Sequence, residues 1–148
     1  MKYLLCFALL TSAVWTTLAA DPHDTQSVQG DWVPVQAELA SHPMPDAILK
    51  TISLKLGTNS YDVLVGNAPD KGTYTVDAAT VPKSMVVTGT EGPNQGKVFP
   101  AIYELEGDTL RICYDLSGAK RPTEFKTLAG TKLYLVTYHR KPLTVLVK

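Results

Sequence analysis

Residues 101–114, AIYELEGDTLRICY, decide the fold class because they predict a β-hairpin with a single register. If Gly107 and Asp108 form a two-residue turn, Leu105 faces Leu110 and Tyr103 faces Ile112 across the hairpin. Strand side chains alternate between two faces, so one face carries Ala101, Tyr103, Leu105, Leu110, Ile112 and Tyr114. The other face carries Ile102, Glu104, Arg111 and Cys113, with Glu104 and Arg111 as a predicted cross-strand charge pair. We predict that the apolar face points into a core.

Segments typical of short strands lie on both sides of this hairpin, separated by turn residues. They predict strands at 32–39, 51–56, 60–65, 72–76, 84–88, 97–105, 110–114 and 132–140. Pro34 restricts the first strand to an edge, a strand start or a bulge. The only helix signal is one short turn at residues 46–50, after Pro45. Because the hairpins follow one another without long crossovers, we predict an all-β fold, a single antiparallel up-and-down β-barrel of about eight strands.

Residues 1–19 are typical of a secretory signal peptide. Lys2 supplies a positive charge, residues 3–10 are apolar, and small residues lead to a cleavage site after Ala19 or Ala20. The alternative is a membrane anchor, although the apolar run is short for a span of about 20 residues. We predict that the protein is exported to the periplasm or the extracellular space, with no stable membrane span after processing.

The processed chain is predicted to consist of three parts. Residues 20–29 are polar and aperiodic, which is typical of a flexible leader. Residues 30–140 form the predicted barrel domain, a single one because about 150 residues correspond to one domain. Residues 141–148 form an apolar tail that would add an edge strand or mediate association.

The charge balance argues against a nucleic-acid partner, because such proteins usually carry a basic surplus. The chain has 14 Lys and Arg against 14 Asp and Glu, and loss of Lys2 with residues 1–19 leaves a net charge of −1. Cys6 is lost with the same segment, so Cys113 is the only remaining thiol. It is either buried as a small hydrophobic side chain or paired with another chain.

Residues at the two ends of the predicted barrel resemble the closure of lipocalins. Gly30-Asp31-Trp32 opens the first strand, and Arg140 ends the last. In lipocalins a Gly-x-Trp tryptophan closes the barrel base, and a basic residue from the end of the barrel packs on its ring. The resemblance implies that Trp32 and Arg140 close this barrel, with the guanidinium stacked on the indole. The alternative is that Trp32 is simply a core aromatic residue.

A longer stretch, from Gly30 to about Arg140, is similar to a family of small exported lipocalin-like domains of unknown function, expanded in planctomycete-type bacteria. The matching segments are residues 30–32, 72–74, 90–97, 102–114 and 121–125. The resemblance implies a calycin-type barrel. It implies no particular activity and brings no catalytic residue.

Residue types with catalytic or metal-binding chemistry are scattered along the chain. The three histidines lack the spacing of a zinc site, and Asp62, Asp70 and Asp77 lack the compact spacing of a calcium loop. There is no nucleophile elbow and no glycine loop for phosphates. We therefore predict a non-enzymatic protein without metal or cofactor. An enzymatic alternative would need His139 beside an acid inside the barrel.

Tyrosines in the predicted strands suggest a binding site inside the barrel. Tyr74, Tyr103, Ile112 and Tyr114 are the predicted lining residues, because tyrosines offer apolar contact and a few hydroxyl groups to a small molecule. An eight-stranded barrel either fills itself with side chains or holds one small ligand. We predict that this barrel binds a small hydrophobic or amphipathic molecule.

A different class of function, a protein-interaction or inhibitor module with an envelope protein as partner, would use the loops and the tail. Residues 91–97, EGPNQGK, are either a loop at the barrel mouth, with Glu91, Asn94 and Lys97 as polar groups, or a turn shaped by glycine and proline. Residues 121–125 have the same two interpretations: Phe125 covering the core while Arg121 and Glu124 pair, or Arg121 recognising a ligand.

Overall fold

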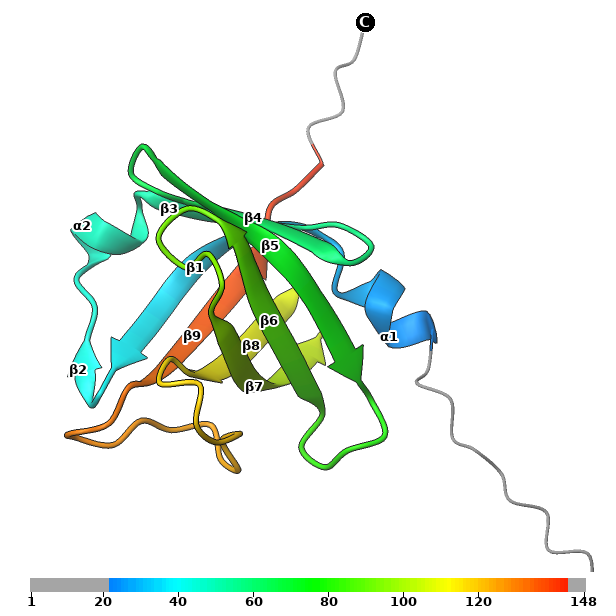
Figure 1. Ribbon diagram of the computed structural model, residues 1–148. Helices are drawn as coiled ribbons and strands as arrows, with labels where there is room; N and C mark the ends of the chain where they lie inside the picture. The colour runs from blue at the N-terminus through cyan, green and yellow to red at the C-terminus, as the bar shows by residue number, and fades with distance from the viewer. Residues whose placement is uncertain (1–21, 144–148) are drawn as a thin grey trace, which may run out of the picture.

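The computed structural model describes residues 22–143, which form a barrel with short helices beside it (Figure 1). The elements in chain order are α1 (Pro22–Ser27), β1 (Gly30–Leu39), β2 (His42–Pro43), α2 (Asp46–Leu49), β3 (Ile52–Leu56), β4 (Ser60–Val65), β5 (Ala68–Asp77), β6 (Ser84–Glu91), β7 (Val98–Glu106), β8 (Thr109–Asp115) and β9 (Leu133–Arg140). The predicted helical turn at residues 46–50 is confirmed as α2. Figure 1 shows α1 and α2 on opposite sides of the barrel.

The strands pair in sequence order, and pairing of β9 with β1 closes the sheet. All pairs are antiparallel, so the predicted all-β, up-and-down barrel is confirmed, with β2 as an extra strand on β1. The closing pair runs from Trp32 opposite Arg140 to Leu39 opposite Tyr134. Its register shifts between Pro34 and Gln36, which agrees with the bulge considered for Pro34.

The hairpin of β7 and β8 has the predicted register. Leu105 lies opposite Leu110, and Glu104 lies opposite Arg111. Gly107 adopts a positive φ of 57° in the two-residue turn, a conformation that glycine accepts without steric cost. The face predicted to point inward is buried or nearly so in the core. Arg111 Nε donates to Glu104 Oε2 over 3.1 Å, which confirms the predicted charge pair.

The outer face of this hairpin is partly covered: Ile102 and Cys113 are buried, whereas Glu104 and Arg111 are half-exposed. Cys113 is buried and unpaired by disulfide, and its thiol donates to Lys126 O over 3.7 Å. The Arg111 guanidinium lies 4.4 Å from the centre of the Phe125 ring. Arg121 and Glu124 do not form the predicted pair; Glu124 pairs with Lys126 instead. The segment between β8 and β9 therefore acts as a cover for one side of the sheet.

The prediction of a flexible leader at residues 20–29 is wrong for its described part. Pro22–Ser27 forms α1, and Val28, which follows it, is fully buried. The Asp24 carboxylate accepts bonds from Lys83 Nζ over 2.6 Å and from the Tyr103 hydroxyl over 2.7 Å. A six-residue polar helix has no apolar periodicity to reveal it, and its stability comes from these tertiary contacts.

Two further predictions fall on the ends of the chain. The signal peptide at residues 1–19 and most of the apolar tail, residues 144–148, lie outside the described residues. Among residues 22–143, no helix is long and apolar enough to cross a membrane.

Candidate functional site

One end of the barrel, the base, is closed by Trp32 and Arg140. The Trp32 side chain is 1% exposed, and its indole Nε1 donates to Val28 O over 2.9 Å. The Arg140 guanidinium lies 4.2 Å from the centre of the Trp32 ring. Arg140 also donates to the carbonyl groups of Ser27 and Gln29. The contact implied by the lipocalin resemblance is therefore present, and α1 is part of it.

The other end of the barrel, the mouth, contains a cavity of about 460 Å³. This volume lies within the range of about 300–1,000 Å³ typical of small-molecule sites. The walls are largely apolar and come from β3 to β9, with Leu54, Leu56, Val63, Met85, Val87 and Phe99 among them. Of the two alternatives for the barrel interior, the hollow one is correct for this half.

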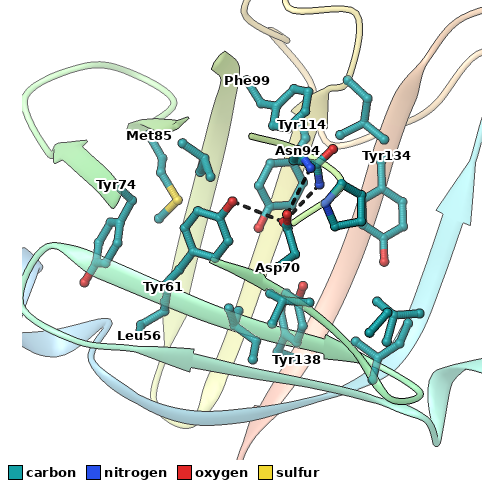
Figure 2. A pocket seen from close by; sticks show the side chains of 18 residues that line it. Leu56, Tyr61, Asp70, Tyr74, Met85, Asn94, Phe99, Tyr114, Tyr134 and Tyr138 are labelled. Carbon is teal, nitrogen blue, oxygen red and sulfur yellow. Dashed lines mark hydrogen bonds between the residues drawn. The ribbon is translucent and has the colours of Figure 1, made fainter. Parts of the chain in front are cut away.

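Within residues 22–143, Asp70 is the one acidic side chain that lines the cavity. It lies on β5 and is only 9% exposed. Its Oδ2 accepts a bond from the Tyr61 hydroxyl over 3.1 Å and one from Asn94 Nδ2 over 2.9 Å, and its Oδ1 accepts one from Asn94 N over 3.1 Å. Figure 2 shows these side chains pointing toward one another inside the cavity.

The loop between β6 and β7, residues 92–97, is held at the mouth by this carboxylate. Asn94 and Pro93 line the cavity, whereas Glu91 and Lys97 are exposed. A Cβ on Gly89 would lie 2.0 Å from Asn94 O, so glycine is required where the loop folds back on its own strand. The loop is therefore both a turn and a part of the mouth. Its predicted role in binding a protein stays a prediction.

Tyrosines make up the rest of the polar lining. The rings of Tyr114 and Tyr134 stack with centroids 5.9 Å apart. Burial raises the pKa of Tyr134 to about 12. Burial also raises the pKa of Tyr114 and of Tyr138 above the usual value, because an ionised phenol would lose its hydration and would repel the ionised form of its tyrosine neighbours. Burial and the nearby Asp70 carboxylate raise the pKa of Tyr61. These phenols therefore stay neutral at physiological pH.

The four predicted lining residues separate into two pairs. Tyr74 and Tyr114 line the cavity. Tyr103 and Ile112 are fully buried in the core and are not among the lining residues. All four share the inward face, but alternation along a strand specifies the face and not the height in the barrel.

Asp70 is the polar lining residue that sequence reasoning missed. Residues 66–70 look like a turn cluster, yet β5 begins at Ala68. If the strand predicted at 72–76 is extended toward the N-terminus, Asp70 lies two residues before Gly72 and four before Tyr74. All three then face the barrel interior. This two-residue spacing could have identified Asp70 as an inward residue, but Gly66 and Pro69 made the segment look like a turn.

Metal-binding and histidine chemistry is not assembled in the cavity. Within residues 22–143, no group of three or more His, Cys, Asp or Glu side chains could hold a metal ion. His42 and His139 are both exposed, and neither is among the residues that line the cavity. The cavity lining described here combines apolar walls with Asp70, Asn94 and five tyrosines.

No known protein family, curated protein or solved structure matches this chain. The resemblance to the planctomycete-type family therefore stays a prediction. The fold and the site define the chain only as an antiparallel barrel that is closed at one end and hollow at the other.

Proposed function

We propose that this protein is a lipocalin-like, non-enzymatic carrier that binds one small, mainly apolar molecule in the mouth of its barrel. The observation that carries the proposal is the cavity of about 460 Å³ with largely apolar walls. Apolar surface that leaves water on binding contributes about 25 cal/mol per Å² before the costs of association are subtracted. The polar groups in the lining would orient the ligand, as in other small-molecule sites.

The choice of binding over catalysis rests on how the polar lining groups are engaged. Both Asp70 oxygens already accept hydrogen bonds, and the Tyr74 hydroxyl donates to Gly57 O over 2.6 Å. Groups held in this way by neighbouring side chains and backbone suit recognition and orientation of a ligand.

A neutral fluorescent probe, N-phenyl-1-naphthylamine, tests the proposal without depending on charge. We expect saturable binding of one probe per chain, and Val87→Phe should weaken it by about tenfold because the new ring fills part of the cavity. Val86→Phe is the matched control, because Val86 precedes the lining residue Val87 and points to the opposite face. Absence of saturable binding, or equal loss in both variants, would contradict the proposal.

We also propose that the protein works outside the cytoplasm, because residues 1–19 have the pattern of a signal peptide. The mass of the protein recovered from the culture medium or the periplasm tests this. We expect the mass of a chain that begins after Ala19 or Ala20. Full-length protein confined to the cytoplasm would contradict the proposal.

A further inference from the structure

Asp70 differs from the acidic side chains that form ion pairs, because its hydrogen-bond partners carry no charge. Glu104 and Asp108 pair with arginines, and Asp62 pairs with Lys71. Asp70 forms no ion pair with any residue between 22 and 143, and its three hydrogen-bond donors are neutral groups. The carboxylate is thus a buried negative charge without a positive partner in the described part of the chain.

A second buried acid, Asp115, shows what an acid with a purely structural role looks like. Its carboxylate is wrapped by the turn that follows it, with bonds from Ser117 N, Ser117 Oγ and Lys120 N. Asp115 is not among the residues that line the cavity, whereas Asp70 is. The two acids have similar burial, but only Asp70 faces the space that a ligand would occupy.

The acceptor capacity of Asp70 is not exhausted. An ionised carboxylate offers about four acceptor sites, and three of them are used. Oδ2 accepts two bonds and Oδ1 accepts one, so the remaining site is on Oδ1. Burying a carboxylate against apolar walls is costly unless a positive charge compensates it, and the attraction between opposite charges is stronger there than in water.

The surrounding side chains also favour a cation. The cavity lining formed by residues 22–143 contains five tyrosines and Phe99 but no lysine, arginine or histidine. Aromatic ring faces attract ammonium groups through their quadrupole. An anionic ligand would instead meet the Asp70 charge with no cation to offset it.

We propose that the ligand is a cationic amphiphile: a protonated amine that donates an N–H bond to Asp70 Oδ1, with an apolar tail against the walls of β3, β4 and β6. The inference rests on the proposed function and names the class of molecule that the same cavity takes. The ammonium group supplies the positive charge that Asp70 lacks, and the tail excludes water from the apolar half of the cavity.

Three probes with the same ten-carbon tail test the inference: decylamine, which is cationic at pH 7, 1-decanol and decanoate. The affinity of each probe is measured by titrating it into the wild-type protein with bound N-phenyl-1-naphthylamine and following the displacement of this dye. We expect decylamine to bind at least about tenfold more tightly than 1-decanol, and decanoate to bind most weakly. Equal affinities of decylamine and 1-decanol, or failure of all three probes to displace bound N-phenyl-1-naphthylamine, would overturn the inference and leave the proposed function standing. Absence of saturable N-phenyl-1-naphthylamine binding would remove both.

Variants then assign the selectivity to its residue. Asp70→Asn should abolish the preference for decylamine, so that the ratio of the 1-decanol and decylamine dissociation constants in this variant falls to about one. Asp62→Asn is the matched control, because Asp62 lies exposed on the neighbouring strand and carries the same charge outside the cavity. Retained preference in Asp70→Asn would overturn the role of this carboxylate. If Asp70→Asn no longer binds the neutral probe, the comparison of the three probes on the wild-type protein still decides whether the cavity prefers a cation.

Discussion

The two ends of this barrel are built from the same strands, but the base is filled with side chains and the mouth is hollow. At the base, Trp32, Leu110 and Ile112 fill the interior, and α1 and Arg140 seal it. At the mouth, Val63, Val87 and the tyrosines border a cavity. The difference arises from what covers each end, since inward alternation of side chains is the same throughout. Trp32, with the Arg140 guanidinium on its ring, closes the base, whereas loops surround the mouth.

The largest expected effect is the difference in the free energy of unfolding when one large side chain is truncated at each end. Trp32→Ala should lower the free energy of unfolding by about 3–5 kcal/mol, because a fully buried indole is replaced by a void. Tyr134→Ala at the mouth should cost only about 1 kcal/mol, since this ring already borders empty space. Urea denaturation measures both values. Equal losses would mean that the ends are packed alike.

A smaller effect is expected from the cation that seals the base. Arg140→Met keeps the apolar stem but removes the ring contact and the bonds to Ser27 and Gln29, so we expect a loss of about 1.5–3 kcal/mol. Arg111→Met is the matched control, because Arg111 also lies over an aromatic ring but forms a half-exposed pair with Glu104. It should cost below about 1 kcal/mol. The reverse order in thermal or urea unfolding would refute the role given to Arg140.

Adding volume should distinguish a filled interior from a hollow one. Ala101→Leu places extra carbon atoms in the fully buried core and should cost about 1–3 kcal/mol. Ala68→Leu adds the same volume beside the cavity and should change stability by no more than about 0.5 kcal/mol. The same denaturation experiment serves for both. A large penalty for Ala68→Leu would show that the mouth has no spare room.

A further effect appears only at alkaline pH. The pKa of Tyr134 is raised to about 12 by burial, so the folded state holds its proton after the unfolded chain, with a pKa near 10, has lost it. The contribution to stability is therefore complete below pH 10 and is lost as the pH rises toward 12. Stability curves should fall less steeply over this range in Tyr134→Phe than in the wild type. Superimposable slopes would show that Tyr134 titrates normally.

Sequence reasoning predicted the parts of this molecule that depend on local pattern. The register of the β7–β8 hairpin follows from one glycine turn and strict alternation, and the barrel follows from repeated hairpins. The Trp32–Arg140 contact was implied by a resemblance in sequence, and the structure contains it.

The parts that were missed depend on tertiary contacts. The helix α1 is polar and short, and its role becomes visible through tertiary contacts such as the bonds from Lys83 and Tyr103 to Asp24. Asp70 looks like a turn residue until its strand is paired with β4. Whether a barrel is filled depends on the sum of side-chain volumes at each height, and no single motif carries that information.

A crystal structure of the protein grown with N-phenyl-1-naphthylamine tests the division into a solid base and a hollow mouth most directly. We predict one probe molecule inside the barrel, in contact with Val63, Val87 and Phe99, and none against Trp32. An empty interior with the probe on the outer surface, or side chains collapsed into the mouth, would contradict this division.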